Sequence, residues 1–197
     1  MSPRRTIASA PTAAPERLHF SGDREADELL ARDPLALLIG FVLDQQVPMP
    51  KAFAGPRELE RRLGDLDAGR IAGLELAELD RAFRERPAIH RFPGSMAARV
   101  QELCRVIVSE YGGRAEHVWT EASSSDDLRR RIAALPGFGE MKIRALASVL
   151  AKRLGVRAAE PLVPAYPTPG DIDSDEARER YQQAKREHKA RLRSSRA

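Results

Sequence analysis

The apolar residues of this 197-residue chain recur at helical spacing over most of its length, and no segment alternates as a half-buried strand would. Stretches such as DREADELLARD and DPLALLIGFVLDQQ place their apolar residues on one side of a helix, and glycine or proline separates most of these stretches. RLHF is too short to indicate more than a brief extended segment. We therefore predict an all-α fold of about eight to ten short helices, without an internal repeat.

Capping residues mark several of the helix ends. Asp33 stands before Pro34, as an N-cap stands before a proline in the first turn. A short helix over PRELERRLG should stop at Gly64, and a long one should begin with Ser95 as its cap and stop at Gly112. The four prolines of VRAAEPLVPAYPTPGDIDS exclude a regular helix there, and a last helix should follow.

Length and composition indicate one soluble domain. We expect residues 1–16, rich in Pro, Ala, Ser and Thr, to be disordered, 17–175 to form the helical domain, and 176–197 to form a basic helix and tail. No run is apolar enough to span a bilayer, and the N-terminus lacks the apolar centre of a signal peptide. These features predict a cytoplasmic protein without a membrane partner.

The single cysteine, Cys104, excludes an intrachain disulfide and a four-cysteine iron–sulfur cluster. Its helical spacing from apolar neighbours predicts a packed side chain, and Tyr111 and Trp119 are also expected in the core. The four histidines do not have the spacing of metal ligands, so we expect neither a metal nor another cofactor.

The C-terminal stretch ARERYQQAKREHKARLRSSRA holds eight Lys or Arg and two acidic residues, in a chain of pI about 9.6. Such a tail is typical of proteins that bind nucleic acid, although a solvated or disordered end has the same composition.

The most specific motif is LPGFG, between two helical stretches. With no side chains at Gly137 and Gly139, the backbone N–H groups of the turn and of the next helix are open to an anion such as a DNA phosphate. Lys142 and Arg144 follow and add positive charge. An ordinary turn between helices, with a glycine C-cap, would look the same.

Three stretches together, LLIGFVLDQQVPM, PAIHRFPGSMAARVQEL and LPGFGEMKIRALASVLAKRLGV, resemble the HhH-GPD superfamily of DNA glycosylases, in particular its small bacterial base excision repair proteins. The resemblance covers roughly residues 20–193 and implies a helical domain with one helix-hairpin-helix. It also implies a nucleoid-associated protein that binds double-stranded DNA at a damaged or mismatched base, and we expect the protein to be a monomer. The hairpin residues implied to contact DNA are Gly137, Phe138, Gly139, Met141 and Lys142.

The resemblance also assigns roles to two loops. Gln46, with Gln45 beside it, would fill the gap left by a flipped base. Both glutamines could instead be a polar helix end. His90 and Arg91 could contact a base edge or phosphate, whereas Phe92 and Pro93 could simply pack against the start of the following helix.

The catalytic carboxylate is where the chain departs from the superfamily. The superfamily register falls on Ala159, which cannot stabilise a cationic sugar. Asp171, which closes a Gly/Pro loop, is the main candidate, and Glu160, Asp173 and Asp44 are alternatives. Asp173 and Asp175 can also be explained as N-caps of the last helix.

A bifunctional member of the superfamily has a lysine two residues after the second hairpin glycine, where this chain has Met141. Lys142 is one residue later, about 100° around the helix, and is expected to miss the pocket and contact phosphate. We therefore predict a monofunctional glycosylase. A noncatalytic module that recognises bent or damaged DNA is the alternative, and a helical protein scaffold is a third.

Overall fold

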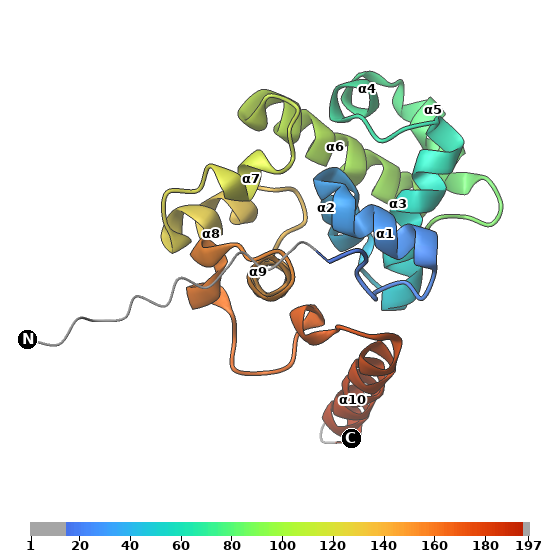
Figure 1. Cartoon of the computed structure of the whole chain (residues 1–197). Helices are drawn as coiled ribbons and strands as arrows, with labels where there is room; N and C mark the ends of the chain where they lie inside the picture. Colours follow the sequence, from blue (N-terminus) through green and yellow to red (C-terminus); the bar gives the residue numbers. More distant parts are fainter. Residues whose placement is uncertain (1–14, 195–197) are drawn as a thin grey trace, which may run out of the picture.

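The computed structural model describes residues 15–194, and their side chains as far as residue 187. The predicted disorder of residues 1–16 thus falls almost entirely outside the described residues. The described part is all-α, with two short 3-10 helices and no strand (Figure 1), which confirms the predicted fold class. No helix in this part is long and apolar enough to cross a membrane.

The first group of helices contains α2, which is buried at every position from Leu35 to Leu43 and packs against α1, α3 and α6, whereas α4 and α5 pack on α6. Asp33 caps α2 by accepting hydrogen bonds from Leu35 N and Ala36 N, as predicted. A helix that is apolar on all sides needs neighbours on all sides. The group comprises α1 (Arg24–Arg32), α2 (Pro34–Leu43), α3 (Met49–Leu63), α4 (Ala68–Gly73), α5 (Leu76–Arg84) and α6 (Pro93–Tyr111).

Two predicted helix starts were wrong. α3 begins at Met49 and continues through Pro56, because the burial of Met49 and Phe53 outweighs the cost of an internal proline, about 3 kcal/mol. α6 begins at Pro93 and not behind a Ser95 cap, since proline suits a first helical position. The predicted ends hold: Gly64 and Gly112 both adopt left-handed backbone, with φ of 91° and 61°.

The second group comprises α7 (His117–Thr120), α8 (Ser125–Ala133), α9 (Glu140–Lys152) and the 3-10 helices η1 (Arg157–Leu162) and η2 (Pro169–Asp171). Both 3-10 helices pack against α9, so the proline-rich segment is ordered. The contact between η2 and α9 is close at Gly170, where a Cβ atom would overlap the backbone of Ser148. This packing fixes the position of Asp171.

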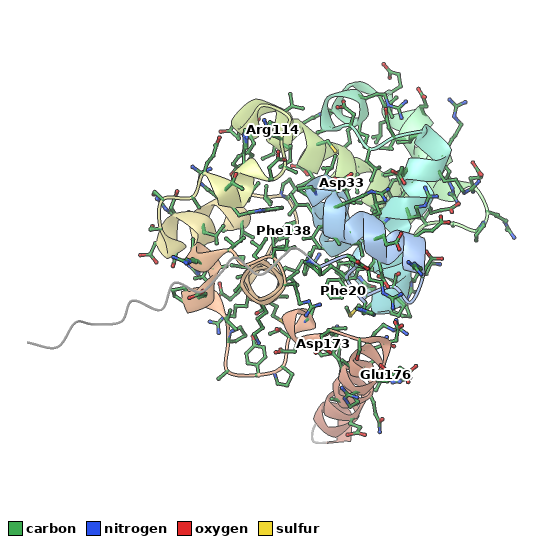
Figure 2. The ribbon with its side chains drawn as sticks, in the orientation of Figure 1. Phe20, Asp33, Arg114, Phe138, Asp173 and Glu176 are labelled. Carbon is green, nitrogen blue, oxygen red and sulfur yellow. The ribbon has the colours of Figure 1, made fainter. Side chains whose placement is uncertain are left out.

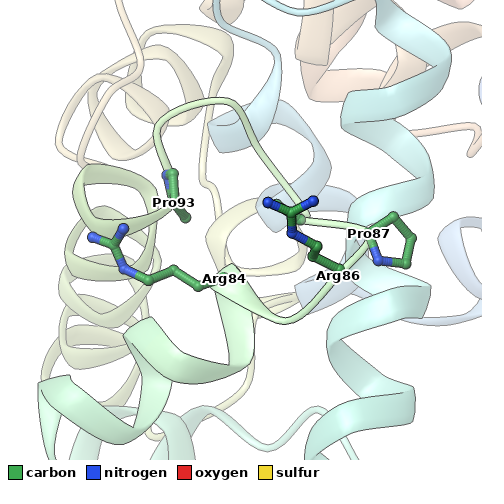
Figure 3. Close-up of a pocket in the computed structure, with 5 residues that line it drawn as sticks. Arg84, Arg86, Pro87 and Pro93 are labelled. Carbon is green, nitrogen blue, oxygen red and sulfur yellow. The ribbon is translucent and has the colours of Figure 1, made fainter.

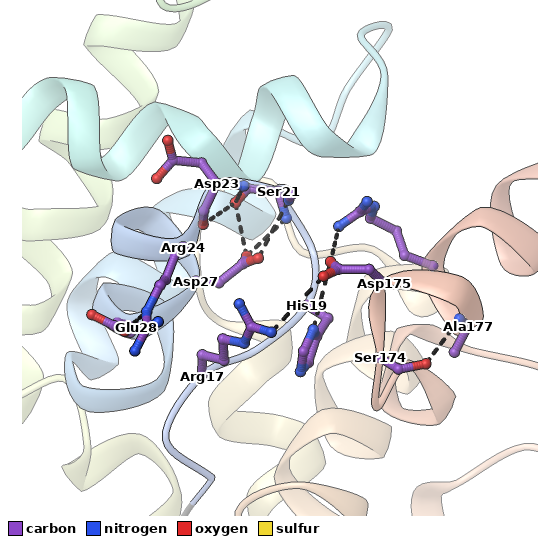
Figure 4. Close-up of polar contacts among 12 residues, drawn as sticks. Arg17, His19, Ser21, Asp23, Arg24, Asp27, Glu28, Ser174, Asp175 and Ala177 are labelled. Atoms are coloured by element: carbon purple, nitrogen blue, oxygen red, sulfur yellow. Dashed lines mark hydrogen bonds and ion pairs between the residues drawn. The ribbon is translucent and has the colours of Figure 1, made fainter.

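The last helix, α10 (Asp175–Ser194), extends from the body (Figure 1). Ser174 is its N-cap, since Ser174 Oγ accepts a hydrogen bond from Ala177 N at 3.1 Å. The explanation of Asp173 and Asp175 as N-caps was therefore wrong. Asp175 instead pairs with Arg178 at 2.5 Å and with His19 at 3.6 Å, which attaches α10 to the segment before α1 (Figure 4).

The core contains the residues that were predicted for it. Cys104 is fully buried, and burial raises the pKa of its thiol to about 12, so it behaves as a small apolar side chain. Tyr111 and Trp119 are also buried.

Candidate nucleic-acid interface

Three segments that are far apart in the sequence meet where α2 ends. They are the turn that follows α2, the loop that precedes α6, and the turn between α8 and α9. Phe138 belongs to the hairpin (Figure 2). Its ring centre lies 6.3 Å from that of Phe41 on α2. His90, in the loop before α6, lies with Nε2 2.9 Å from the Gln45 carbonyl oxygen. The three motifs of the sequence therefore form one continuous region.

The turn after α2 treats its two glutamines differently. Gln45 is held by its side chain: Nε2 donates to Val42 O at 2.7 Å, and Oε1 accepts from Arg99 at 2.6 Å. Gln46 is exposed and has a φ of 55°, the one positive φ among non-glycine residues of the described chain. Such a backbone costs about 1–3 kcal/mol and is often found at functional sites. Of the two predicted wedge residues, only Gln46 has a free side chain.

Arg99 of α6 links this turn to the hairpin, a role that sequence reasoning missed. Its guanidinium binds Gln45, and its Cδ lies 3.0 Å from the position that a Cβ atom on Gly137 would occupy. Nothing in the spacing of AARVQEL distinguishes this arginine from the many others, because its role depends on two distant loops.

The hairpin between α8 and α9 presents its backbone to solvent at one point. Gly137 has a φ of 83°, so the turn itself requires glycine. Gly139 is different: its φ is −84°, and nothing lies within 4 Å of where its Cβ would be. No side chain caps α9, whose first N–H groups lack helical partners. Met141, in the same turn, is 81% exposed.

Lys142 does not point into solvent as a free phosphate contact would. Its Nζ lies 3.4 Å from Val42 O, at the end of α2, so the ammonium is directed toward the same region as the Gln45 turn. Burial, together with the charge of Arg99, lowers the pKa of Lys142 to about 8, although Asp44 acts in the opposite direction. That Lys142 misses the pocket and contacts phosphate stays a prediction; the structure shows its ammonium beside the end of α2.

Positive charge around the hairpin is partly neutralised within the protein. Glu140 forms ion pairs with Arg129 at 2.6 Å and with Arg144 at 2.9 Å. These two arginines flank the open turn, but both of them are already paired with the carboxylate of Glu140.

His90 was predicted as a possible DNA contact, and its position excludes that role for its side chain. It is 1% exposed and bonds to backbone on both sides of its ring. Arg91 and Phe92, next in the loop, are both exposed, and the guanidinium of Arg91 lies 4.8 Å from the Phe92 ring centre. Phe92 thus does not pack into the start of α6.

Asp171, the main candidate for the catalytic carboxylate, is ionised, and both of its carboxylate oxygens form hydrogen bonds. Its Oδ2 accepts two hydrogen bonds from Thr168, and its Oδ1 lies 2.5 Å from Lys152 Nζ. Partial burial alone would raise the pKa of Asp171, but the bonds from Lys152 and Thr168 outweigh it and lower the pKa.

Tyr181 of α10 is a half-buried phenol in the negative field of two candidate carboxylates. Burial, together with the negative charges of Asp44 and Asp171, raises the pKa of this phenol to about 12. Asp44 is the residue directly after α2, next to the glutamine turn. Sequence reasoning missed Tyr181, although an aromatic ring in so polar a helix is a sign of an anchored face.

The other two carboxylates that were considered are exposed, as Asp171 also is: Glu160 lies on η1, and Asp173 lies between η2 and α10. Neither of them forms an ion pair with a described residue.

The distribution of charge makes α10 distinct. Residues 177–197 hold eight of the 33 Lys and Arg and two of the 29 acidic residues, so the remainder of the chain, with 25 and 27, has a slight negative excess. From Gln183 to Glu187 every side chain of α10 is exposed. The positive excess of the whole chain therefore lies in its C-terminal segment 177–197, most of which belongs to α10.

A separate hollow of about 740 Å³ lies between the end of α5 and the start of α6 (Figure 3). It is lined by Arg84, Arg86, Pro87, Ala88 and Pro93. None of the predicted site residues lines it.

No known family model matches the chain, and no curated protein is significantly similar to it. The geometry of the described residues is therefore the basis on which a function can be argued.

Proposed function

We propose that this protein is a monofunctional DNA glycosylase of base excision repair, with an HhH-GPD-like domain. The observation that carries the proposal is the junction at the end of α2, where an exposed glutamine on left-handed backbone stands beside a hairpin with an open glycine. An enzyme that flips a base needs contacts that hold the DNA phosphate backbone and a side chain that fills the gap.

In this proposal the turn at Gly139 holds a phosphate of double-stranded DNA. The first N–H groups of α9 donate to the phosphate oxygens, and the positive end of the helix dipole favours the anion. Gln46 enters the base stack, where its amide can bond to the orphaned base. The strain at Gln46 is consistent with a residue that is selected for its position and not for its stability.

A carboxylate then stabilises the sugar as the base departs. The C1′–N bond breaks with its electron pair on the base, which takes up a proton, and water adds to C1′ with loss of a proton. Asp171 is our candidate for this group, since it is ionised and held by Thr168. Asp44 is the alternative, since it lies next to the glutamine turn.

The pairing of Asp171 with Lys152 supports a second candidate function. A carboxylate whose charge is already balanced is a weaker stabiliser of a cation, so a noncatalytic module that recognises damaged DNA fits this observation.

The test is single-turnover excision on duplexes that contain uracil, hypoxanthine, an alkylated purine, an oxidised guanine or a mismatch. We expect strand cleavage only after alkali, and loss of at least roughly 100-fold in rate for Asp171→Asn with DNA affinity retained. Asp173→Asn, nearby and exposed, is the matched control and should be fully active. If Asp44→Asn alone is inactive, the carboxylate is Asp44.

Two other outcomes have definite meanings. Salt-sensitive binding without excision on any substrate would favour the noncatalytic module. A covalent adduct with abasic DNA after borohydride, absent in Lys142→Met, would show that Lys142 is an amine nucleophile and would refute the monofunctional assignment. Lys142 is the lysine to test, because an amine whose pKa is lowered to about 8 is partly neutral near pH 8.

A further inference from the structure

His90 connects two exposed loops through a single buried ring. Its Nε2 lies 2.9 Å from the Gln45 carbonyl oxygen, and its Nδ1 lies 3.1 Å from Phe92 N. Since a backbone N–H can only donate, Nδ1 must be the acceptor and Nε2 must carry the proton. The ring is thus neutral and has one defined tautomer.

The two bonds fix residues that have free side chains. Gln46 follows Gln45 in the strained turn, and Phe92 is 42% exposed in the loop before α6. The ring of Phe92 lies 6.0 Å from the His90 ring. Arg99 of α6 also holds the Gln45 side chain, and Phe92 directly precedes α6, so the histidine adds a direct bond between two loops that both adjoin this helix.

We propose that His90 is a positioning residue that holds Gln46 and Phe92 at a fixed spacing, and that protonation of its Nδ1 releases the Phe92 loop. A proton on Nδ1 removes the acceptor of the Phe92 N–H and places two donors face to face. Its effect on DNA binding rests on the function proposed above, whereas its effect on the loops does not.

The surroundings of the ring oppose protonation. Burial is the main cause that lowers the pKa of His90, and the charges of Lys51 on α3 and Arg91 in its own loop act in the same direction. The bonds to the Gln45 and Leu43 carbonyls favour the charged form but do not prevail. Release is therefore expected below the ordinary histidine pKa of about 6.5 and not at neutral pH.

The first part of the test uses the free protein. The amide signals of Phe92 and Gln46 are followed by NMR between pH 8 and pH 5, together with the His90 ring. We expect the Phe92 amide to shift in one transition that coincides with the His90 titration. In His90→Gln, whose amide can still donate to Gln45 O but does not titrate, this transition should be absent. A His90 ring that titrates while the Phe92 amide stays unchanged would overturn the proposal.

The second part uses DNA. The probe is a duplex with a tetrahydrofuran abasic site and 2-aminopurine opposite, whose fluorescence reports unstacking when a side chain enters the gap. Wild type should lose this signal below about pH 6.5, and His90→Gln should show a flat profile. His90→Leu, which keeps neither bond, should bind at least roughly 10-fold more weakly at every pH, with its fold checked by circular dichroism.

The two parts separate the possible failures. An NMR transition without any response to DNA would refute the proposed function and leave the role of His90 intact. A wild-type DNA signal that is present but does not change from pH 8 to pH 5, or a His90→Gln signal that still falls, would refute the effect of His90 on DNA binding.

Discussion

Gly139→Ala tests whether the open hairpin glycine serves the fold or a ligand. The backbone at Gly139 suits any residue, and an added Cβ would meet no atom within 4 Å. Alanine restricts the unfolded chain, which stabilises by about 0.4–1 kcal/mol, but is a poorer N-cap than glycine by a similar amount. The free energy of unfolding should therefore change by less than about 0.5 kcal/mol.

Gly137→Ala is the matched variant, two residues away. Its φ of 83° is costly for alanine, and the added Cβ would lie 3.0 Å from Arg99 Cδ. We expect a loss of about 1–2 kcal/mol from the left-handed backbone, and a somewhat greater loss if the Arg99 side chain cannot shift.

The effect of Gly139→Ala on DNA affinity should be large, although its effect on the free energy of unfolding is small. The methyl group of Gly139→Ala would stand where a phosphate approaches the first N–H groups of α9, so affinity should fall at least roughly 10-fold, equal to about 1.4 kcal/mol. Urea unfolding and fluorescence anisotropy with a short duplex measure the two quantities. If Gly139→Ala binds DNA like wild type, the hairpin does not grip a phosphate there. If it unfolds as easily as Gly137→Ala, the glycine serves the fold.

Four further outcomes are expected. Glu140→Gln should free Arg129 and Arg144 for DNA and raise the affinity for DNA about 2- to 5-fold at low salt, whereas unchanged affinity would place DNA elsewhere. Removal of residues 184–197, which takes away six Lys or Arg, should lower the slope of log affinity against log salt by about 3, and an unchanged slope would exclude contact by α10. Gln46→Gly should relieve the strained backbone, with stability unchanged or raised by up to about 1 kcal/mol, and should weaken binding to abasic DNA; a marked loss of stability would contradict this. Because the pKa of Lys142 is lowered in the folded state, the unfolded chain keeps its proton to higher pH. Urea stability should thus rise as pH increases through about 8, and Lys142→Met should lack this rise.

The structure shows a difference between the two glutamines that the sequence does not reveal. DQQ predicts either a wedge or a polar helix end, and the two positions look alike. Arg99 distinguishes the two side chains, since its bond to Gln45 leaves only Gln46 free, and the wedge role of Gln46 stays a prediction. Arg99 is 53 residues beyond Gln46 in the chain, so local pattern could not reveal it.

The sequence also could not predict the environment of the titratable groups. Helical geometry alone predicted that Lys142 misses the pocket, but it could not show that this side chain lies toward Val42. His90 looked like an exposed loop residue and is buried between two loops. In both cases the pKa depends on desolvation, which requires knowledge of the surrounding elements.

The sequence by itself determined the all-α class, the cap at Asp33, the helix ends at Gly64 and Gly112, and the need for glycine at position 137. These features follow from side-chain periodicity and local backbone preference, which act over a few residues. Only the tertiary structure decided that the end of α2, the His90 loop and the hairpin meet, and which of their side chains remain free. Those contacts join residues 40 to 100 positions apart, where the packing of whole helices and not local preference sets the geometry.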